Sequence, residues 1–251
     1  MSYLNTVPLV WGMLHGAQET LFDIEFRLPS GCADALERGE ADIGIVPAIE
    51  VERLGLDVIP GVGIACRGAV RSILLFSKKP PGEIRTLAAD TSSRSSVALA
   101  QVILKRRYGS SPVLVPCAPD VEAMLGKADA AVLIGDPALR AEPEALPYAC
   151  LDLGAEWEAL SGLPMVFAVW ACRQGLDAAA LAPAFRESWY LGMQNLDEIV
   201  RREAPLRGIP EERAREYLTR RIVFEINERE RDGMRLFLEY AQAAREAGAA
   251  A

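Results

Sequence analysis

The sequence predicts an α/β protein of two lobes with mostly parallel sheets, two crossover strands and a helical C-terminal segment. Short apolar runs recur between segments of helical periodicity, and this alternation favours parallel strands joined by crossover helices. The composition shifts at residues 77–82, where two lysines, two prolines and a glycine follow an apolar run. Helical patterns then dominate residues 178–202 and 228–246.

The expected elements follow the chain in order. Alternating apolar and charged residues over 22–28 predict a half-exposed strand at a sheet edge. Other strands are expected at 43–46, 70–76, 86–89, 113–115, 130–134 and 165–171, and helices at 32–38, 49–54, 95–108 and 121–125. The chain should cross between lobes after 70–76 and return with 165–172. Lobe 1 is therefore expected to hold residues 1–76 and 172–251, with the last helices packed on it, and lobe 2 residues 77–171.

Composition and charge exclude several classes of protein. Hydrophobic residues make up 51% of the 251 residues, enough for a buried core. The net charge of −8 argues against a nucleic-acid surface, which needs a basic face. The longest apolar run is about half of the roughly 20 residues of a membrane span. The N-terminus shows no export signal, and the five widely spaced cysteines include no C-x-x-C pair, so a cytoplasmic protein with reduced thiols is expected.

A hydroxyl-rich helix start is the main candidate site. It lies between a short strand and a strong helix and contains five hydroxyl residues: Thr91, Ser92, Ser93, Ser95 and Ser96. The first N–H groups of a helix have no partners and carry partial positive charge, so added hydroxyls make a cradle for a carboxylate or phosphate. A simple helix cap is the alternative, but one cap explains only one hydroxyl.

Two further segments carry candidate residues. Asn5 or Thr6 would cap a helix at the end of a first strand, where side chains of an α/β sheet face the crevice. Ser72 is a polar residue inside an apolar strand, and its neighbour Arg71 is a candidate cation for an anionic ligand or else lies at a solvated strand edge.

Two other positions favour structural roles. Asp136 follows Gly135 and precedes a proline, an arrangement typical of a helix cap, although both residues also count as binding candidates. His15, the only histidine, lies near a helix end, where a cation meets the helix dipole. Metal-binding, Walker, dinucleotide and serine-hydrolase motifs are absent from the sequence.

Taken together, several of these motifs resemble chorismate dehydratase, the first enzyme of the futalosine route to menaquinone. The resemblance extends to about residue 173, with the motifs in the same order, and it rests on residues 3–8, 41–47, 70–77, 91–96, 133–136, 152–157 and 162–168. It implies the fold of periplasmic solute-binding proteins, with two α/β lobes. It also implies conversion of chorismate to 3-[(1-carboxyvinyl)oxy]benzoate by loss of water, without a metal or organic cofactor.

The resemblance assigns roles to named residues. Asn5 and Ser72 would be the active-site polar residues, the 91–96 loop would receive a substrate carboxylate, and the backbone at Pro47 and Ala48 would lie against the ligand. The proton acceptor stays open: the substrate's own enolpyruvyl carboxylate has been suggested for this family, and Asp136 or Glu50 are alternatives.

Two rival functions share this fold. One is a solute-binding protein for a small aromatic or other organic anion, because fold does not fix function. The other is the naphthoate-forming enzyme later in the same pathway, which is expected to use a histidine base in its second lobe. The chain has no histidine besides His15, so the dehydratase is the preferred hypothesis.

Overall fold

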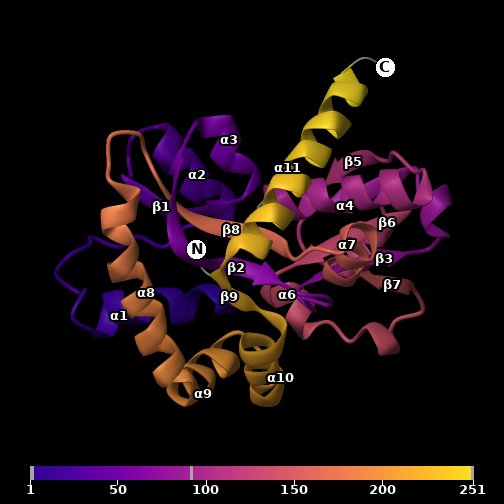
Figure 1. Ribbon diagram of the computed structural model, residues 1–251. Coiled ribbons are helices and arrows are strands. Elements are labelled where there is room, and N and C mark those ends of the chain that lie inside the picture. Colours follow the sequence, from indigo (N-terminus) through magenta and orange to yellow (C-terminus); the bar gives the residue numbers. More distant parts are fainter. Residues whose placement is uncertain (1–2, 91–92, 250–251) are drawn as a thin grey trace.

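The strands form two sheets in the computed structural model, which describes residues 3–90 and 93–249 (Figure 1). The first sheet has the order β1-β8-β2-β9, with strands Ile43–Pro47, Met165–Cys172, Asp57–Cys66 and Val223–Ile226. The second has the order β5-β4-β6-β3-β7, with strands Val113–Pro116, Thr86–Ala89, Ala130–Ile134, Ile73–Ser77 and Ala149–Asp152. The predicted two-lobed α/β class is confirmed.

Helices surround both sheets. Those that pack around the first sheet are α1 (Val7–His15), α2 (Pro29–Glu37), α3 (Ile49–Leu54), α8 (Ala178–Gln194) and α9 (Leu196–Leu206). Those of the second are α4 (Arg94–Tyr108), α5 (Val121–Leu125), α6 (Asp136–Arg140) and α7 (Leu153–Ser161). The chain ends with α10 (Glu211–Glu216) and α11 (Glu228–Ala249), and its short turns are η1 (Leu4–Thr6), η2 (Pro81–Glu83), η3 (Pro143–Ala145) and the π-helical η4 (Tyr217–Arg221).

Local sequence explains several helix ends. The carboxylates of Asp152 and Asp177 accept hydrogen bonds from the first backbone N–H groups of α7 and α8, as good N-caps do. Gly109 ends α4 in the left-handed conformation, which glycine adopts without steric cost.

The expectation of mostly parallel sheets is wrong. Within the described residues, only β4–β5 and β4–β6 pair in parallel, and the other pairs are antiparallel. The returning strand β8 inserts between β1 and β2 and runs against both. Alternation of strands and helices predicts crossover connections, but it gives no sign that a later strand will separate two parallel ones.

The expected edge strand at 22–28 is also absent, because this described segment forms no ladder with any strand. Phe22 and Ile24 are half-buried and pack against the core, and Asp23 between them is exposed. Phe26 and Leu28, which continue the apolar alternation, are exposed, so only the first part of the segment has a buried face.

Sheet membership shifts the expected lobe boundaries. Strand β3 belongs to the second sheet and β8 to the first, whereas the predicted division at 76/77 and 171/172 separates them the other way. The chain passes from the first sheet to the second between β2 and β3 and returns between β7 and β8.

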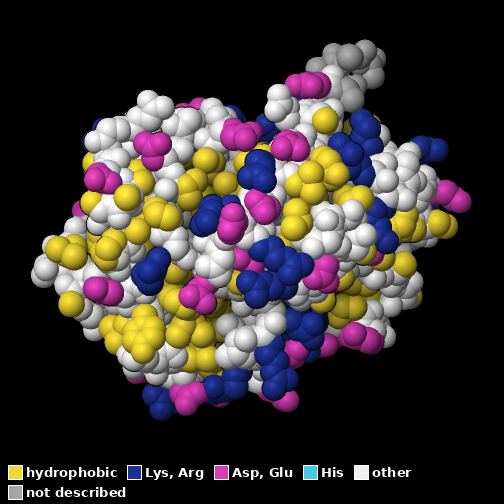
Figure 2. Space-filling view, viewed as in Figure 1, with side chains coloured by type: hydrophobic (Ala, Val, Ile, Leu, Met, Phe, Trp, Pro, Cys, Tyr) yellow, Lys and Arg dark blue, Asp and Glu magenta, His cyan; other side chains and the backbone are white. Residues whose placement is uncertain are grey.

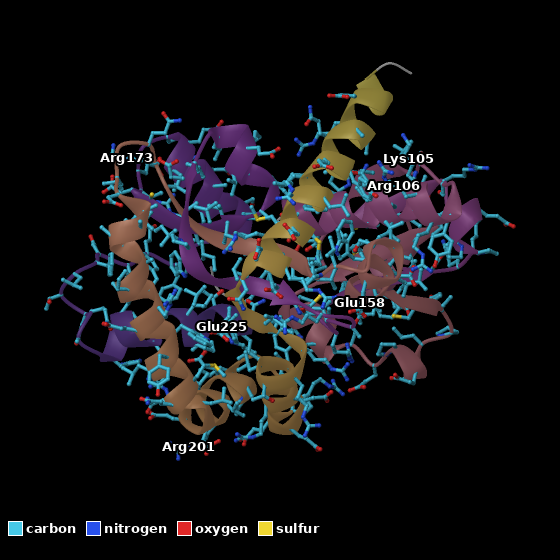
Figure 3. All side chains as sticks on the ribbon, viewed as in Figure 1. Lys105, Arg106, Glu158, Arg173, Arg201 and Glu225 are labelled. Atoms are coloured by element: carbon cyan, nitrogen blue, oxygen red, sulfur yellow. The ribbon has the colours of Figure 1, made fainter. Side chains whose placement is uncertain are left out.

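The C-terminal segment contacts elements of both sheets. Helix α8 packs on α1, where the Ser188 hydroxyl donates to Leu9 O at 2.9 Å. Strand β9 then adds an edge to the first sheet. Helix α11 crosses to α4, where Arg106 lies 3.4 Å above the centre of the Tyr240 ring (Figures 1 and 3).

The visible surface mixes charges of both signs. In Figure 2, Lys and Arg side chains alternate with Asp and Glu across this face. In the part of the chain that the structure describes, no helix is long and apolar enough to cross a membrane.

Candidate active site

A small cleft lies between the two sheets. Its walls come from both lobes, and they consist of Tyr3, Asn5, Pro29, Pro47, Ile64, Phe167 and Ala168 on one side and Ser72, Ile73, Ser93, Ser96, Ile134 and Gly135 on the other. Among the described residues, none that lines the cleft carries a formal charge. A bound anion would therefore meet hydroxyl, amide and backbone dipoles.

Asn5 and Ser72 meet at a third side chain. Asn5 Nδ2 donates to Tyr217 Oη at 2.9 Å, and Tyr217 Oη donates to Ser72 Oγ at 3.0 Å. Tyr217 is 1% exposed and begins η4. Burial raises the pKa of its phenol, although the hydrogen bonds with Ser72 and Asn5 act in the opposite direction. The phenol is therefore protonated at neutral pH.

Gly135 positions Ser72 from the neighbouring strand. The Gly135 N–H donates to Ser72 O at 2.7 Å, at the point where β6 ends and α6 begins. Its φ of 69° with ψ of −140° lies in a region that only glycine adopts readily. A Cβ at this position would lie 2.8 to 2.9 Å from the Tyr3 ring. The absence of a side chain lets Tyr3 and Ser72 share this corner of the cleft.

Asp136 caps the short helix η1 and not α6, the helix that it was expected to cap. Its Oδ1 accepts from Leu4 N at 3.0 Å, and Oδ2 lies 3.4 Å from Arg207 Nη1, while it makes no capping bond at the start of α6. Burial raises the pKa of this carboxyl. Because Leu4 begins η1, Asp136 fixes the turn that carries Asn5, but its side chain does not line the cleft.

The hydroxyl-rich helix start is divided between two tasks. Ser93 and Ser96 line the cleft, and their Oγ atoms are 2.9 Å apart. Ser93 is the N-cap residue of α4 yet makes no side-chain capping bond, so the simple cap does not explain it. Ser95 faces the other lobe, where its Oγ accepts from Ile49 N at 3.2 Å. Thr91 and Ser92, also expected at this site, lie outside the described residues.

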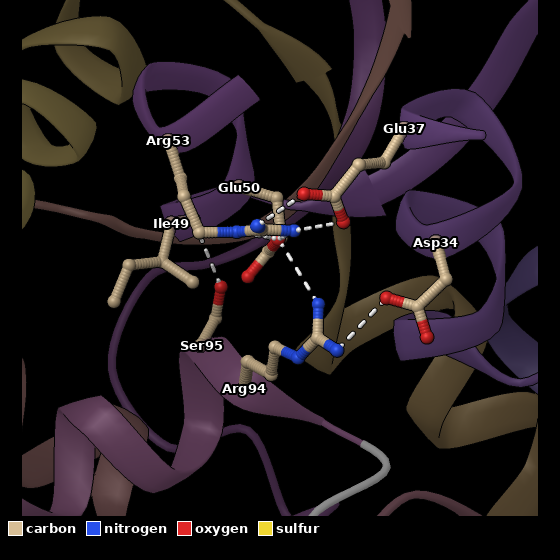
Figure 4. A network of polar contacts seen from close by, with 7 residues as sticks. All are labelled: Asp34, Glu37, Ile49, Glu50, Arg53, Arg94 and Ser95. Carbon is tan, nitrogen blue, oxygen red and sulfur yellow. Dashed lines mark hydrogen bonds and ion pairs between the residues drawn. The ribbon is translucent and has the colours of Figure 1, made fainter. Parts of the chain in front are cut away.

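Next to this helix start, charged side chains join the lobes (Figure 4). Arg94 of α4 pairs with Glu50 Oε2 at 3.1 Å and with Asp34 Oδ1 at 2.9 Å. Arg53 pairs with the same Glu50 oxygen at 2.6 Å and with Glu37 at 2.9 Å. Glu50 is therefore held by two arginines outside the cleft, and this arrangement does not favour it as a proton acceptor.

The structure does not bring every candidate into the cleft. The guanidinium of Arg71 donates to Ala138 O and Ala141 O at 2.7 and 2.6 Å, at the C-terminal end of α6, so the expectation that it faces the ligand is wrong. Pro47 lines the cleft, whereas Ala48 is fully buried and donates its N–H to Phe167 O.

His15 also lies outside the cleft. It is exposed at the end of α1, where its ring lies 4.3 Å from that of Trp11. This position agrees with the structural role expected for it.

Comparison with known proteins decides the family. A family model described as menaquinone biosynthesis matches residues 1–243. The chain belongs to the menaquinone biosynthesis family. A curated chorismate dehydratase from Thermus thermophilus is 30% identical over 94% of this chain and 92% of its own length. The resemblance expected from the motifs is thereby confirmed.

Solved structures show the fold of this family member. Protein AF1704 from Archaeoglobus fulgidus has a TM-score of 0.73 at 20% identity, covering 96% of this chain and 94% of its own. The periplasmic aliphatic sulphonate-binding protein of Escherichia coli has a TM-score of 0.63 at 16% identity, covering 97% and 85%. The fold is that of the periplasmic binding proteins, as the motifs imply.

No sequence pattern marks Tyr217, whose hydroxyl lies between the side chains of Asn5 and Ser72 in this menaquinone biosynthesis family member. It lies among the arginines of a polar segment, where a single aromatic residue looks like an ordinary half-buried helix position. Phe167 and Ile64 were also missed as cleft residues, because both lie in strands whose apolar pattern indicates core.

Proposed function

We propose that this protein is a chorismate dehydratase, which converts chorismate to 3-[(1-carboxyvinyl)oxy]benzoate by loss of water. The observation that carries the proposal is the meeting of Asn5 and Ser72, each hydrogen-bonded to Tyr217, in an uncharged cleft that Ser93 and Ser96 of a helix start also line. The family and the 30% identical relative support the same reaction.

The cleft has groups suited to a dianion. The N-terminus of α4 carries partial positive charge, and the Ser93 and Ser96 hydroxyls beside it would donate to one carboxylate of chorismate. Apolar walls, including Phe167, would contact the ring and exclude water, which strengthens each polar contact. A neutral lining also favours release of the product, because no fixed cation would hold it.

The reaction needs little covalent help. A ring C–H bond and the neighbouring C–OH bond break. The ring proton passes to a carboxylate base, the hydroxyl departs with the electrons of its C–O bond and takes up a proton to become water, and the electron pair of the C–H bond completes an aromatic ring. In this proposal Asn5 and Ser72 hydrogen-bond the departing hydroxyl, and the Ser72 donor stabilises the charge that develops on it. The enzyme mainly holds and orients the substrate.

The proton acceptor in this proposal is the enolpyruvyl carboxylate of the substrate. Asp136 and Glu50, the two alternatives, are engaged by backbone and arginine groups and do not line the cleft. Among the described lining residues no carboxylate, histidine or lysine offers itself as a base. The substrate is then the nearest source of a carboxylate.

We further propose that the lobes close over the substrate and that the reaction takes place in the cytoplasm. Arg94 and Ser95 already connect α4 to α2 and α3 across the cleft edge, so closure would be stabilised at this point. All five cysteines are free thiols, which suits a reducing compartment.

The test is incubation of the purified protein with chorismate, followed by mass detection. A product lighter by one water is expected, with the absorbance of a substituted benzoate. Tight binding of chorismate without any such product would instead favour a solute-binding protein for organic anions.

A further inference from the structure

A tyrosine hydroxyl joins the two polar side chains that this proposal places at the departing hydroxyl. Asn5, Ser72 and Tyr217 come from three distant parts of the chain, with separations of 212 residues between Asn5 and Tyr217 and 145 between Ser72 and Tyr217. Tyr217 does not line the cleft, so it cannot touch a substrate bound there. Any part it plays in the reaction must act through its two partners.

The phenol restricts how its partners can bond. A tyrosine hydroxyl has one hydrogen and donates only once. Tyr217 donates to Ser72 Oγ, so toward Asn5 it is an acceptor, and the Asn5 amide must direct Nδ2 at it. The Asn5 Oδ1 then points away from the tyrosine, within 3.5 Å of Thr6 Oγ1. Ser72 accepts from the tyrosine, so its own hydrogen is left for a partner in the cleft.

This arrangement makes the two cleft residues complementary. The phenol already engages the Oγ lone pair of Ser72 and the Nδ2 donor of Asn5. Ser72 therefore offers its hydroxyl hydrogen to the cleft, and Asn5 offers its carbonyl oxygen as an acceptor. A substrate hydroxyl has the matching pair, since it can accept from Ser72 and donate to Asn5. As its C–O bond breaks, the leaving oxygen gains negative charge, and its hydrogen bond from Ser72 becomes stronger.

We propose that Tyr217 is a positioning residue that fixes the hydrogen-bonding direction of Asn5 and Ser72 toward the departing hydroxyl. This inference rests on the proposed dehydratase function. Two features keep the tyrosine suited to the task. Its phenol stays neutral, because burial raises its pKa. Its backbone begins a π-helical turn, with Ile222 N donating to Tyr217 O at 3.0 Å, and such turns are frequent at functional sites.

The contrasting explanation is an ordinary buried tyrosine that only stabilises the fold. The two explanations differ in what loss of the hydroxyl does. A structural tyrosine would lower the unfolding midpoint and leave turnover by the folded enzyme unchanged. A positioning tyrosine would lower kcat while leaving KM nearly unchanged, because the serine hydroxyls and apolar walls that bind the substrate are untouched.

The experiment compares Tyr217→Phe with the matched control Tyr108→Phe. Tyr108 also donates its hydroxyl to one partner, Glu156 Oε2 at 2.7 Å, but outside the cleft. Tyr217→Phe is expected to lower kcat about tenfold or more with KM within about twofold, and Tyr108→Phe to leave both unchanged. Equal kcat for the Tyr217→Phe and wild-type enzymes would overturn the inference.

A double-mutant cycle with Ser72→Ala separates action through Ser72 from a general disturbance. If Tyr217 works through its partners, Tyr217→Phe should lower kcat by a smaller factor in the Ser72→Ala background than in the wild type, because only the bond with Asn5 is then left to lose. A full, additive loss in that background would contradict the positioning role. If Tyr217→Phe does not fold, 3-fluorotyrosine at position 217 keeps the hydroxyl with altered donor strength, and kcat should change by about twofold; an unchanged kcat would count against the inference.

The wild-type measurement distinguishes the two levels of the argument. No dehydration of chorismate by the wild-type enzyme would overturn the proposed function and this inference with it. Dehydration by the wild type together with a fully active Tyr217→Phe variant would overturn only the inference.

Discussion

Gly135→Ala tests the corner of the cleft where Gly135 faces the Tyr3 ring. The new Cβ would lie 2.8 to 2.9 Å from the Tyr3 ring, closer than real Cβ contacts allow, so the ring or the strand end must move. The backbone angles add strain, because φ of 69° with ψ of −140° is unfavourable for any residue with a side chain. Together these should lower the free energy of unfolding by about 2–4 kcal/mol.

Gly109→Ala is the matched control. Gly109 has the same φ of 69°, but nothing lies within 4 Å of its Cβ position, so only the left-handed backbone is penalised, by about 1 kcal/mol. Denaturant unfolding measures the free energy of unfolding of each variant, and steady-state kinetics measure activity. Gly135→Ala should also lower kcat, because a shift of the backbone at residue 135 would displace the N–H that donates to Ser72 O. Equal stability of the two variants, with wild-type kcat for both, would refute this account.

Three further predictions concern the cleft. Asn5→Ala should lower kcat more than it raises KM, because Asn5 orients the hydroxyl for its departure; a wild-type kcat would exclude that role. The double variant Ser93→Ala with Ser96→Ala should weaken chorismate binding by about 1–3 kcal/mol in calorimetry, and an unchanged Kd would return both hydroxyls to a structural role. Arg94→Ala should raise KM several-fold, about 1 kcal/mol, because it weakens the contact that holds the two lobes closed over the substrate. The control Arg235→Ala removes an exposed ion pair within α11 and should leave KM unchanged. Equal KM values for the two variants would contradict this prediction.

Much of the fold follows from local pattern. The expected bounds of α3, α5, β4 and β6 agree with the structure, because each has a clear period and is limited by glycine, proline or charged residues. Strand β2 was missed, since Pro60, Gly61 and Gly63 make it look like a loop. Position 63 needs glycine, because a Cβ there would lie 2.7 Å from Ala168 O on the neighbouring strand β8. Strand β8 lies about 100 residues later in the chain, so the sequence around Gly63 does not reveal this contact.

The site was predictable only where residue type and position agree. Asn5, Ser72, Ser93 and Gly135 lie at strand ends or helix starts, and all four line the cleft. Arg71 shares the neighbourhood but has a φ of 68°, and this backbone turn directs its side chain to the carbonyl groups of α6.

Tyr217 could not be found from the sequence. Its importance depends on two hydrogen bonds to residues more than 140 positions away, and tertiary contacts of that kind leave no local pattern.

The most direct test of the central claim is the mass of the organic product after purified protein is incubated with chorismate. The account predicts complete conversion to a benzoate lighter by one water, without added metal or cofactor, and much slower conversion by the Asn5→Ala protein. Recovery of unchanged chorismate from a protein that demonstrably binds it would contradict the account.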